Sequence, residues 1–246
     1  MLKAISAILV AGLTVAGCAP MPTGPRPTTT PTTTSAGQAR PQVSAADEAR
    51  ASTAARRFVS VVRTVEPVAE RQCRARAPEL NCDFIIVVDD RPGQPVNAYQ
   101  TLNSSGRPII AFTLAMIGDV RNADELAFVM SHEAAHHISR HLARQRVNST
   151  AGATIFGQLA NAAGVGGAGV QLATRVGANV GARTYSKDFE LEADYLGAQI
   201  AQAAGYDALN GAEYFTRIPD PGDRFLGTHP PNANRMATVR RAITGR

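Results

Sequence analysis

One short stretch of the sequence carries residues whose types and spacing suit metal chemistry, His132-Glu133-Ala134-Ala135-His136. Four residues are just over one helical turn, so on a helix both imidazoles leave the same face and can bind one metal ion. Glu133 follows the first histidine, where its carboxylate can take a proton from a metal-bound water without binding the metal itself. The pattern predicts two ligands and the general base of a zinc hydrolase.

A zinc site with two histidines and a water lacks one protein ligand. The segment 186–194 offers several carboxylates, of which Glu190 and Asp194 are four residues apart and share one helix face. Glu190 is therefore the preferred third ligand, and Asp194 can accept a hydrogen bond from a ligand imidazole and fix its tautomer. Glu192 points to another side of the same helix and remains the alternative ligand.

His137 and His141 form a second pair of histidines four residues apart. On one continuous helix, at about 100° per residue, they point roughly 140° and 180° away from His132. We therefore expect them to be exposed or to support the ligands from outside the site, and not to bind the same metal ion.

Several motifs together resemble the gluzincin metallopeptidases of the HtpX, BepA and CAAX prenyl protease family. They are HEAAH at 132–136, SKDFELEAD at 186–194, Thr228-His229-Pro230-Pro231 followed by Arg235, and Asn97-Ala98-Tyr99, which is similar to the family's strand before the active-site helix. The resemblance spans roughly residues 47–244 and is strongest to the small bacterial lipoprotein, LoiP-like members. It implies an α+β, mostly helical, zincin-like fold with a small sheet and one zinc ion per chain.

The resemblance also implies roles for single residues. The family's third zinc ligand corresponds to Glu190, and the aspartate that supports the ligands corresponds to Asp194. Lys187 stands where the family has arginine, which keeps the charge but lacks the bidentate fork. His229 has three interpretations: an oxyanion donor, a fourth ligand that keeps the enzyme latent as in BepA, or a turn cap. Tyr185 is a weaker candidate for the oxyanion donor.

The motifs and the resemblance predict a zinc-dependent endopeptidase that hydrolyses misfolded or misassembled proteins of the bacterial envelope. Zinc would lower the pKa of its water toward ~7, and Glu133 would take the proton and return it to the leaving amine. The alternative is a non-hydrolytic, zinc-stabilised lipoprotein that acts as a chaperone or assembly factor. Glu133 distinguishes the two functions, because a structural zinc site has no need of a carboxylate beside an open coordination position.

The elements that must position these residues follow from caps, breakers and periodicity. A capped helix is expected from Ser44 toward Val65, because Pro67 should end it. Long helices are expected at 122–146, capped by Asn122, and at 188–204, with shorter ones at 208–218 and 232–244. Strands are expected at 84–88, 96–101 and 108–112, in a small and partly antiparallel sheet. An extended substrate would pair with the strand at 108–112, taken as an edge strand.

The segment 150–182 is rich in glycine and alanine but is interrupted by polar residues. That composition is too polar for a membrane span and favours loosely helical, closely packing hairpins.

The N-terminus predicts export and lipidation. Residues 1–17 have one basic residue and about a dozen apolar ones, too few for a span of ~20 residues, which indicates a signal peptide. Val15-Ala16-Gly17-Cys18 resembles a lipobox, so Cys18 is expected to carry lipid and attach the protein to a membrane. Residues 18–46 would be a Pro/Thr-rich tether, and 47–246 the metallopeptidase domain. The resemblance points to an outer-membrane lipoprotein that faces the periplasm.

Charge and cysteine content exclude some other functions. The 25 Lys and Arg against 20 Asp and Glu give a net charge of +5 without a long basic run, so nucleic acid is not an expected partner. Cys73 and Cys82 have no Cys-x-x-Cys neighbour, which argues against a redox or cysteine-rich zinc site. In an exported protein they either form a disulfide or remain free. The oligomeric state is left open.

Overall fold

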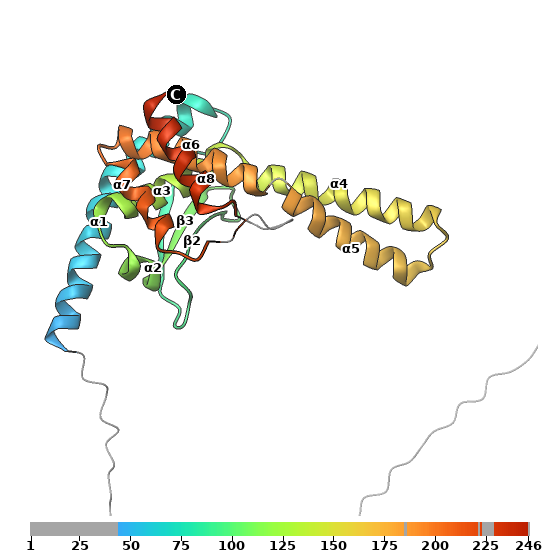
Figure 1. Ribbon diagram of the computed structural model, residues 1–246, viewed down its shortest axis with the longest axis horizontal. Helices are drawn as coiled ribbons and strands as arrows, with labels where there is room; N and C mark the ends of the chain where they lie inside the picture. The colour runs from blue at the N-terminus through green and yellow to red at the C-terminus, as the bar shows by residue number, and fades with distance from the viewer. Residues whose placement is uncertain (1–43, 185, 221, 223–228, 246) are drawn as a thin grey trace, which may run out of the picture. The chain divides into compact units, whose positions relative to one another are not determined.

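The computed structural model describes residues 44–184, 186–220, 222 and 229–245, which form a mostly helical α+β domain with one small sheet (Figure 1). The predicted fold class is confirmed. The elements are α1 (Ala45–Arg76), β1 (Ile85–Asp89), β2 (Ala98–Leu102), β3 (Pro108–Thr113), α2 (Leu114–Asp119), α3 (Ala123–Ile138), α4 (His141–Ala162), α5 (Gly167–Thr184), α6 (Ser186–Ala203), α7 (Ala208–Ala212), the 3-10 helix η1 (Glu213–Thr216) and α8 (Asn232–Thr244). The predicted signal peptide, Cys18 and Tyr185 lie outside the described residues, as does the tether up to residue 43.

The sheet has the strand order β1–β3–β2, with β1 parallel and β2 antiparallel to β3. The prediction of a small, partly antiparallel sheet is therefore confirmed. The expected edge strand is wrong, because the segment 108–112 lies in β3, the central strand, and both of its sides are already paired. In the described part of the chain β2 is an edge strand, and it contacts α3 (Ala123–Ile138).

Helix α1 begins as expected, with the Ser44 side chain accepting a hydrogen bond from the backbone N–H of Asp47. The prediction that it ends before Pro67 is wrong, since it continues to Arg76. Proline removes one backbone hydrogen bond and normally breaks a helix. Here the residues after it, Val68 and Cys73, are buried in the core, so tertiary packing outweighs the local cost.

Helix α3 lies at the centre of the domain and is buried on almost every side. Its N-terminus is capped as expected, because the Asn122 side chain accepts from the backbone N–H of Glu125 at 2.8 Å. The predicted continuation to Arg146 is wrong. The helix stops at Ile138, and Arg140 adopts a left-handed conformation with φ of 57° before α4 begins. This turn changes the direction of the chain directly after the second histidine of HEAAH.

The core joins α1, α3, α6 and the sheet. Its largest fully buried apolar side chains come from these elements, from α8 or from the segment directly before β1: Phe84, Phe112, Phe128, Ile110, Leu126, Met130, Ile200, Val61, Val65 and Val239. Helix α3 is therefore held by packing on several sides at once.

Helices α4 and α5 pack against each other and form a hairpin that extends away from the rest of the domain (Figure 1). The predicted close-packed hairpin is confirmed. A Cβ atom on Gly152 would lie 2.1 Å from the carbonyl oxygen of Gly177, so only glycine allows the two backbones to approach this closely. None of the helices in the described part of the chain combines the length and apolar character needed to cross a bilayer.

The C-terminal helices agree with the sequence to within a few residues. Helix α6 starts at Ser186 and ends at Ala203, and Gly205 follows with the left-handed φ of 85° that suits a helix end. The expected helix at 208–218 divides into α7 and η1, and α8 covers 232–244 as predicted.

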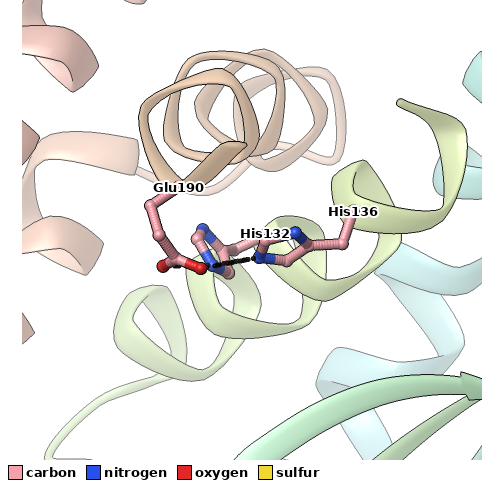
Figure 2. Close-up of side chains that lie close together, drawn as sticks. All are labelled: His132, His136 and Glu190. Carbon is pink, nitrogen blue, oxygen red and sulfur yellow. Dashed lines mark hydrogen bonds and ion pairs between the residues drawn. The ribbon is translucent and has the colours of Figure 1, made fainter. Parts of the chain in front are cut away.

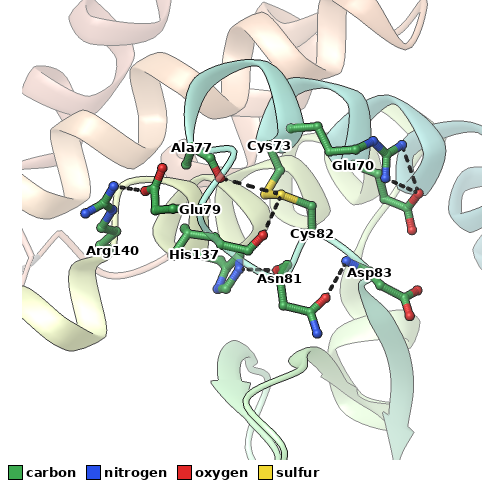
Figure 3. The surroundings of a disulfide bond; sticks show 11 residues. Glu70, Cys73, Ala77, Glu79, Asn81, Cys82, Asp83, His137 and Arg140 are labelled. Carbon is green, nitrogen blue, oxygen red and sulfur yellow. Dashed lines mark hydrogen bonds and ion pairs between the residues drawn. A yellow bond between two sulfur atoms is a disulfide. The ribbon is translucent and has the colours of Figure 1, made fainter.

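A disulfide joins Cys73 at the end of α1 to Cys82 before β1 (Figure 3). The sequence left open whether this pair is bonded, and the structure assigns the bond. Next to it, the backbone carbonyl of Asn81 accepts a hydrogen bond from His137 Nε2 on α3 at 2.8 Å. The disulfide loop is thus connected directly to the helix that carries HEAAH.

Candidate metal centre

Three side chains from two helices converge on one point (Figure 2). His132 and His136 leave the same face of α3, and their Nε2 atoms are 3.0 Å apart. Glu190 comes from α6, with Oε2 3.5 Å from His132 Nε2 and Oε1 3.4 Å from His136 Nε2. The structure therefore brings together the two histidines and the carboxylate that the sequence preferred.

The spacing of these atoms fits a tetrahedral zinc ion. With zinc–ligand bonds of about 2.0–2.1 Å, neighbouring ligand atoms in a tetrahedron are about 3.3 Å apart. The distance of 3.0 Å between the two imidazole nitrogens, and those of 3.5 and 3.4 Å from each of them to one or the other oxygen of Glu190, lie close to that value. Two imidazole nitrogens and one carboxylate oxygen are also a common ligand set of catalytic zinc, which leaves one position for water or substrate.

The approach of α6 to α3 depends on a glycine. A Cβ atom on Gly197 would lie 2.9 Å from both Cα and N of His132. Any larger residue would push the two helices apart exactly where one presents its histidines and the other its glutamate.

Asp194 supports the first histidine from the side away from the cluster. Its side chain is fully buried, and Oδ1 lies 2.9 Å from His132 Nδ1. Arg235, on α8, donates from Nε and Nη2 to the two carboxylate oxygens of Asp194 at 2.7 and 2.6 Å. The guanidinium also lies over the ring of Phe215, with Cζ 3.7 Å from the centroid. A bidentate, aromatic-backed arginine fixes the aspartate, and the aspartate orients the imidazole.

The charges of this network favour a bound cation. Burial by itself would lower the pKa of His132, but hydrogen bonds to Asp194 and Glu190 outweigh it and raise that pKa to about 10. Burial opposes the ionisation of Glu190, yet hydrogen bonds from three imidazoles hold its pKa well below the usual value. The pKa of Asp194 is lowered in the same way, against burial, by the charge of Arg235 and by His132. Both carboxylates are therefore ionised at neutral pH, and a metal ion competes with a proton for His132.

The second histidine is supported by a separate chain of contacts. His136 Nδ1 lies 2.7 Å from His141 Nδ1, and His141 Nε2 lies 3.2 Å from a Glu192 oxygen that also accepts from Arg144. Burial, followed by the nearby His136, lowers the pKa of His141 to about 4, so its ring is neutral. A neutral ring that donates to Glu192 must accept at Nδ1, and His136 then donates from Nδ1 and keeps the lone pair of Nε2 for a metal.

These positions decide three questions that the sequence left open. His137 and His141 are both buried and lie outside the three-ligand cluster, so of the two expected alternatives exposure is excluded, and support of a ligand from outside the site holds for His141. His141 contacts a candidate ligand, whereas His137 bonds to the disulfide loop. Glu192 contacts His141 and Arg144 and takes no part in the described cluster.

The cluster opens into a cleft of about 650 Å³, lined by the segment 96–100, by α3 and α6, and by His229. Glu133 lines the same cleft. His229 Nδ1 lies 3.1 Å from Glu190 Oε2, and its side chain is 53% exposed. This contact favours a role of His229 at the site over the interpretation as a turn cap.

Sequence reasoning missed the function of two residues. The sequence indicates Arg235 only as part of a motif. Its position on a helix after the His-Pro-Pro turn is the one signal that could identify it as the partner of the buried aspartate. His141 was placed on the wrong side because α3 was expected to continue, and no local pattern marks the left-handed turn at Arg140.

Comparison with known proteins agrees with this geometry. A sequence model of peptidase family M48 matches residues 55–243, which include α3, α6 and all but the last residue of α8. The beta-barrel assembly-enhancing protease of Escherichia coli K12 is 32% identical over 136 residues, 48% of this chain and 27% of that protein. A Vibrio cholerae protein provisionally given the same name is 36% identical over 118 residues, 45% of this chain and 24% of that protein. The chain thus matches about a quarter of the length of these relatives.

Proposed function

The chain belongs to peptidase family M48, whose members are zinc metallopeptidases, and from this premise we propose that it is a zinc-dependent endopeptidase with one zinc ion per chain. The observation that carries the proposal is the convergence of His132, His136 and Glu190 beside Glu133, in the wall of an open cleft. A purely structural zinc site would have its coordination positions closed by protein.

The side chains would divide the work as follows. Bound zinc would supply a Lewis acid for the peptide carbonyl and lower the pKa of a water molecule. The Glu133 carboxylate would receive the proton from the attacking water and then deliver it to the nitrogen of the leaving amine. Asp194, held by Arg235, would keep His132 in the tautomer whose Nε2 faces the metal.

The substrate would lie extended beside β2, the strand with a free side at the cleft. The segment 96–100 lines the cleft, so a peptide paired with this strand would pass the cluster. Backbone pairing selects for unfolded chains, because a folded protein has few unpaired strands to offer. A substrate with one N-methylated residue at the pairing position should be cleaved more slowly, and equal cleavage at every methylated position would exclude this mode.

The test of the peptidase activity is degradation of unfolded casein by the wild type, Glu133→Gln and Glu190→Gln, with zinc content measured for each. Glu133→Gln should bind zinc normally and lose activity by at least about a hundredfold. Glu190→Gln should lose both zinc and activity. Equal turnover by Glu133→Gln, or no turnover by either fully metallated wild type or fully metallated His229→Ala, would favour a chaperone or assembly factor.

His229 has two proposed functions at the site. As a fourth ligand it would block the open position, and His229→Ala would increase activity. As an oxyanion donor it would stabilise the transition state, and His229→Ala would lower kcat by about a hundredfold or more. Unchanged activity together with unchanged zinc affinity would remove both functions.

For the location, we propose cleavage after residue 17 and acylation of Cys18, with residues 18–46 as a tether and 47–246 as the peptidase domain on the periplasmic side of the outer membrane. The substrates would be misfolded or misassembled envelope proteins, which is consistent with relatives named for beta-barrel assembly. Radiolabelled palmitate should label the wild type and not Cys18→Ala. Labelling of both proteins would contradict the assignment of Cys18.

A further inference from the structure

The α4–α5 hairpin concentrates exposed apolar side chains. Half of the large hydrophobic residues that the described structure leaves exposed belong to this hairpin and its tip: Val147, Ile155, Leu159, Val165, Leu172 and Val176. The largest exposures are 68% for Val147, 63% for Leu159 and 57% for Leu172. Scattered single exposed residues need no explanation, but a set that shares one projecting element does.

Three of these side chains, Val147, Ile155 and Val176, lie on one side of the hairpin. On α4, the exposed Val147 and Ile155 directly precede Asn148 and Phe156, which pack against α5. On α5, the exposed Val176 likewise directly precedes the packed Gly177. Moving back by one residue along an α-helix is a rotation of about 100° around the helix axis. Because the two helices are antiparallel, this same rotation away from their shared interface turns the side chains of both helices to the same side of the hairpin.

The charged residues of the hairpin are all positive. No aspartate or glutamate occurs between Glu133 and Asp188, whereas arginines lie along the hairpin. Arg144 is paired with Glu192 at the base. Arg146, Arg175 and Arg183 form no ion pair with a carboxylate of the described residues. The hairpin therefore combines an apolar face with uncompensated positive charge.

These features identify the occupant by its chemistry. A second copy of the hairpin would bring like charges together, and a water-exposed apolar face would remain costly in solution. A bilayer surface with anionic headgroups offers hydrocarbon to the apolar side chains and negative charge to the arginines. We infer that the hairpin face formed by Val147, Ile155, Leu159, Leu172 and Val176, with Val165 at the tip, docks on an anionic lipid surface. The inference depends neither on peptidase activity nor on acylation of Cys18.

The test is co-sedimentation with vesicles. The protein used in this test is a variant truncated to start at Ser44. Every element of the described core follows that residue, and the truncation removes the proposed lipid anchor. This protein should bind vesicles of phosphatidylglycerol and phosphatidylethanolamine, and bind phosphatidylcholine vesicles at least about tenfold more weakly. Failure to bind the anionic vesicles, or equal binding to both kinds, would overturn the proposal.

A matched pair of double variants separates the apolar face from net charge. Leu159→Glu with Leu172→Glu places two charges on the proposed face and should weaken vesicle binding by more than about tenfold. Asn161→Glu with Gln171→Glu adds the same charge at exposed polar positions and should weaken binding by less than about threefold. Equal loss in both double variants would contradict docking through the apolar face.

Two further measurements exclude other occupants. All variants should keep the wild-type circular dichroism spectrum, because the altered side chains are exposed. If the wild type is a dimer in sedimentation analysis and the leucine variants become monomers with unchanged vesicle binding, the face is an interface between copies and the proposal fails. The proposal also fails if the double leucine variant binds vesicles as well as the wild type does and loses affinity only for a reduced, unfolded protein.

Discussion

The candidate metal centre and the α4–α5 hairpin are built by opposite means. At the metal centre, buried polar side chains from α3, α6 and α8 hold one another through short contacts between residues far apart in the sequence. In the hairpin, two neighbouring helices approach through glycines, and the larger side chains point into solvent. The geometry of the first region depends on packing across the whole domain, whereas the geometry of the hairpin depends mainly on contacts between its own two helices.

This difference predicts which substitutions should change stability and metal binding and which should not. A buried charge network fails as a unit, because each member leaves a partner unpaired in a medium of low polarity. A hairpin joined to the domain mainly at its base can be altered without disturbing the ligands. Four experiments can contradict or sharpen this contrast, and three of them pair a change near the candidate metal centre with a matched control variant.

The largest effect is expected for Arg235→Met, which removes the guanidinium from the buried carboxylate of Asp194 and leaves it only the contact with His132. The free energy of unfolding should fall by about 3–5 kcal/mol in urea titrations of the metal-free protein. The matched change in the hairpin, Arg175→Met, removes an exposed arginine and should shift the stability by no more than ~0.5 kcal/mol. Similar losses in the two variants would contradict the contrast between the regions.

Removal of the disulfide should have a smaller effect. Replacing both Cys73 and Cys82, nine residues apart, with alanine should lower the free energy of unfolding by about 2–3 kcal/mol, because the unfolded chain regains freedom. The affinity for zinc should change much less, since the ligands keep their other supports. A loss of zinc binding that exceeds the loss of stability would show that the disulfide loop positions α3 through His137.

His141→Ala should weaken zinc binding by about 10–100-fold, because His136 then loses the acceptor that fixes its tautomer. His141→Asn should restore part of the affinity, since its amide oxygen can accept from His136. The control is His137→Ala on the same helix, which should reduce stability and leave zinc affinity nearly unchanged. Competition with a zinc-binding dye measures all three, and equal losses for His137→Ala and His141→Ala would contradict the assigned contact.

The smallest expected effect compares two glycines. Gly197→Ala pushes α6 from His132 and should cost about 1 kcal/mol of zinc binding, roughly fivefold in affinity. Gly177→Ala opens the hairpin, where a Cβ would lie 2.2 Å from the carbonyl oxygen of Gly152, and should leave zinc affinity unchanged. Reduced zinc affinity in Gly177→Ala would mean that the hairpin is coupled to the metal centre.

Much of the fold could be predicted because it follows from local rules. Ser44 and Asn122 mark helix starts through hydrogen bonds that each makes within three residues. The glycine-rich hairpin follows from composition. Pro67 shows the limit of such rules, because the buried residues after it keep α1 helical despite the missing backbone donor.

The sequence alone determined the chemistry of the candidate ligands. Residues four apart on a helix share a face wherever that helix lies, so HEAAH and the pair Glu190 and Asp194 are informative without a tertiary structure. The tertiary structure decided which carboxylate lies beside the histidines and that Arg235 holds Asp194. It also decided that β2 is the edge strand beside the cleft. It also turned His141 toward His136, through the left-handed residue Arg140. These contacts join residues far apart in the sequence or across a change of chain direction, and no periodic pattern encodes how separate elements pack.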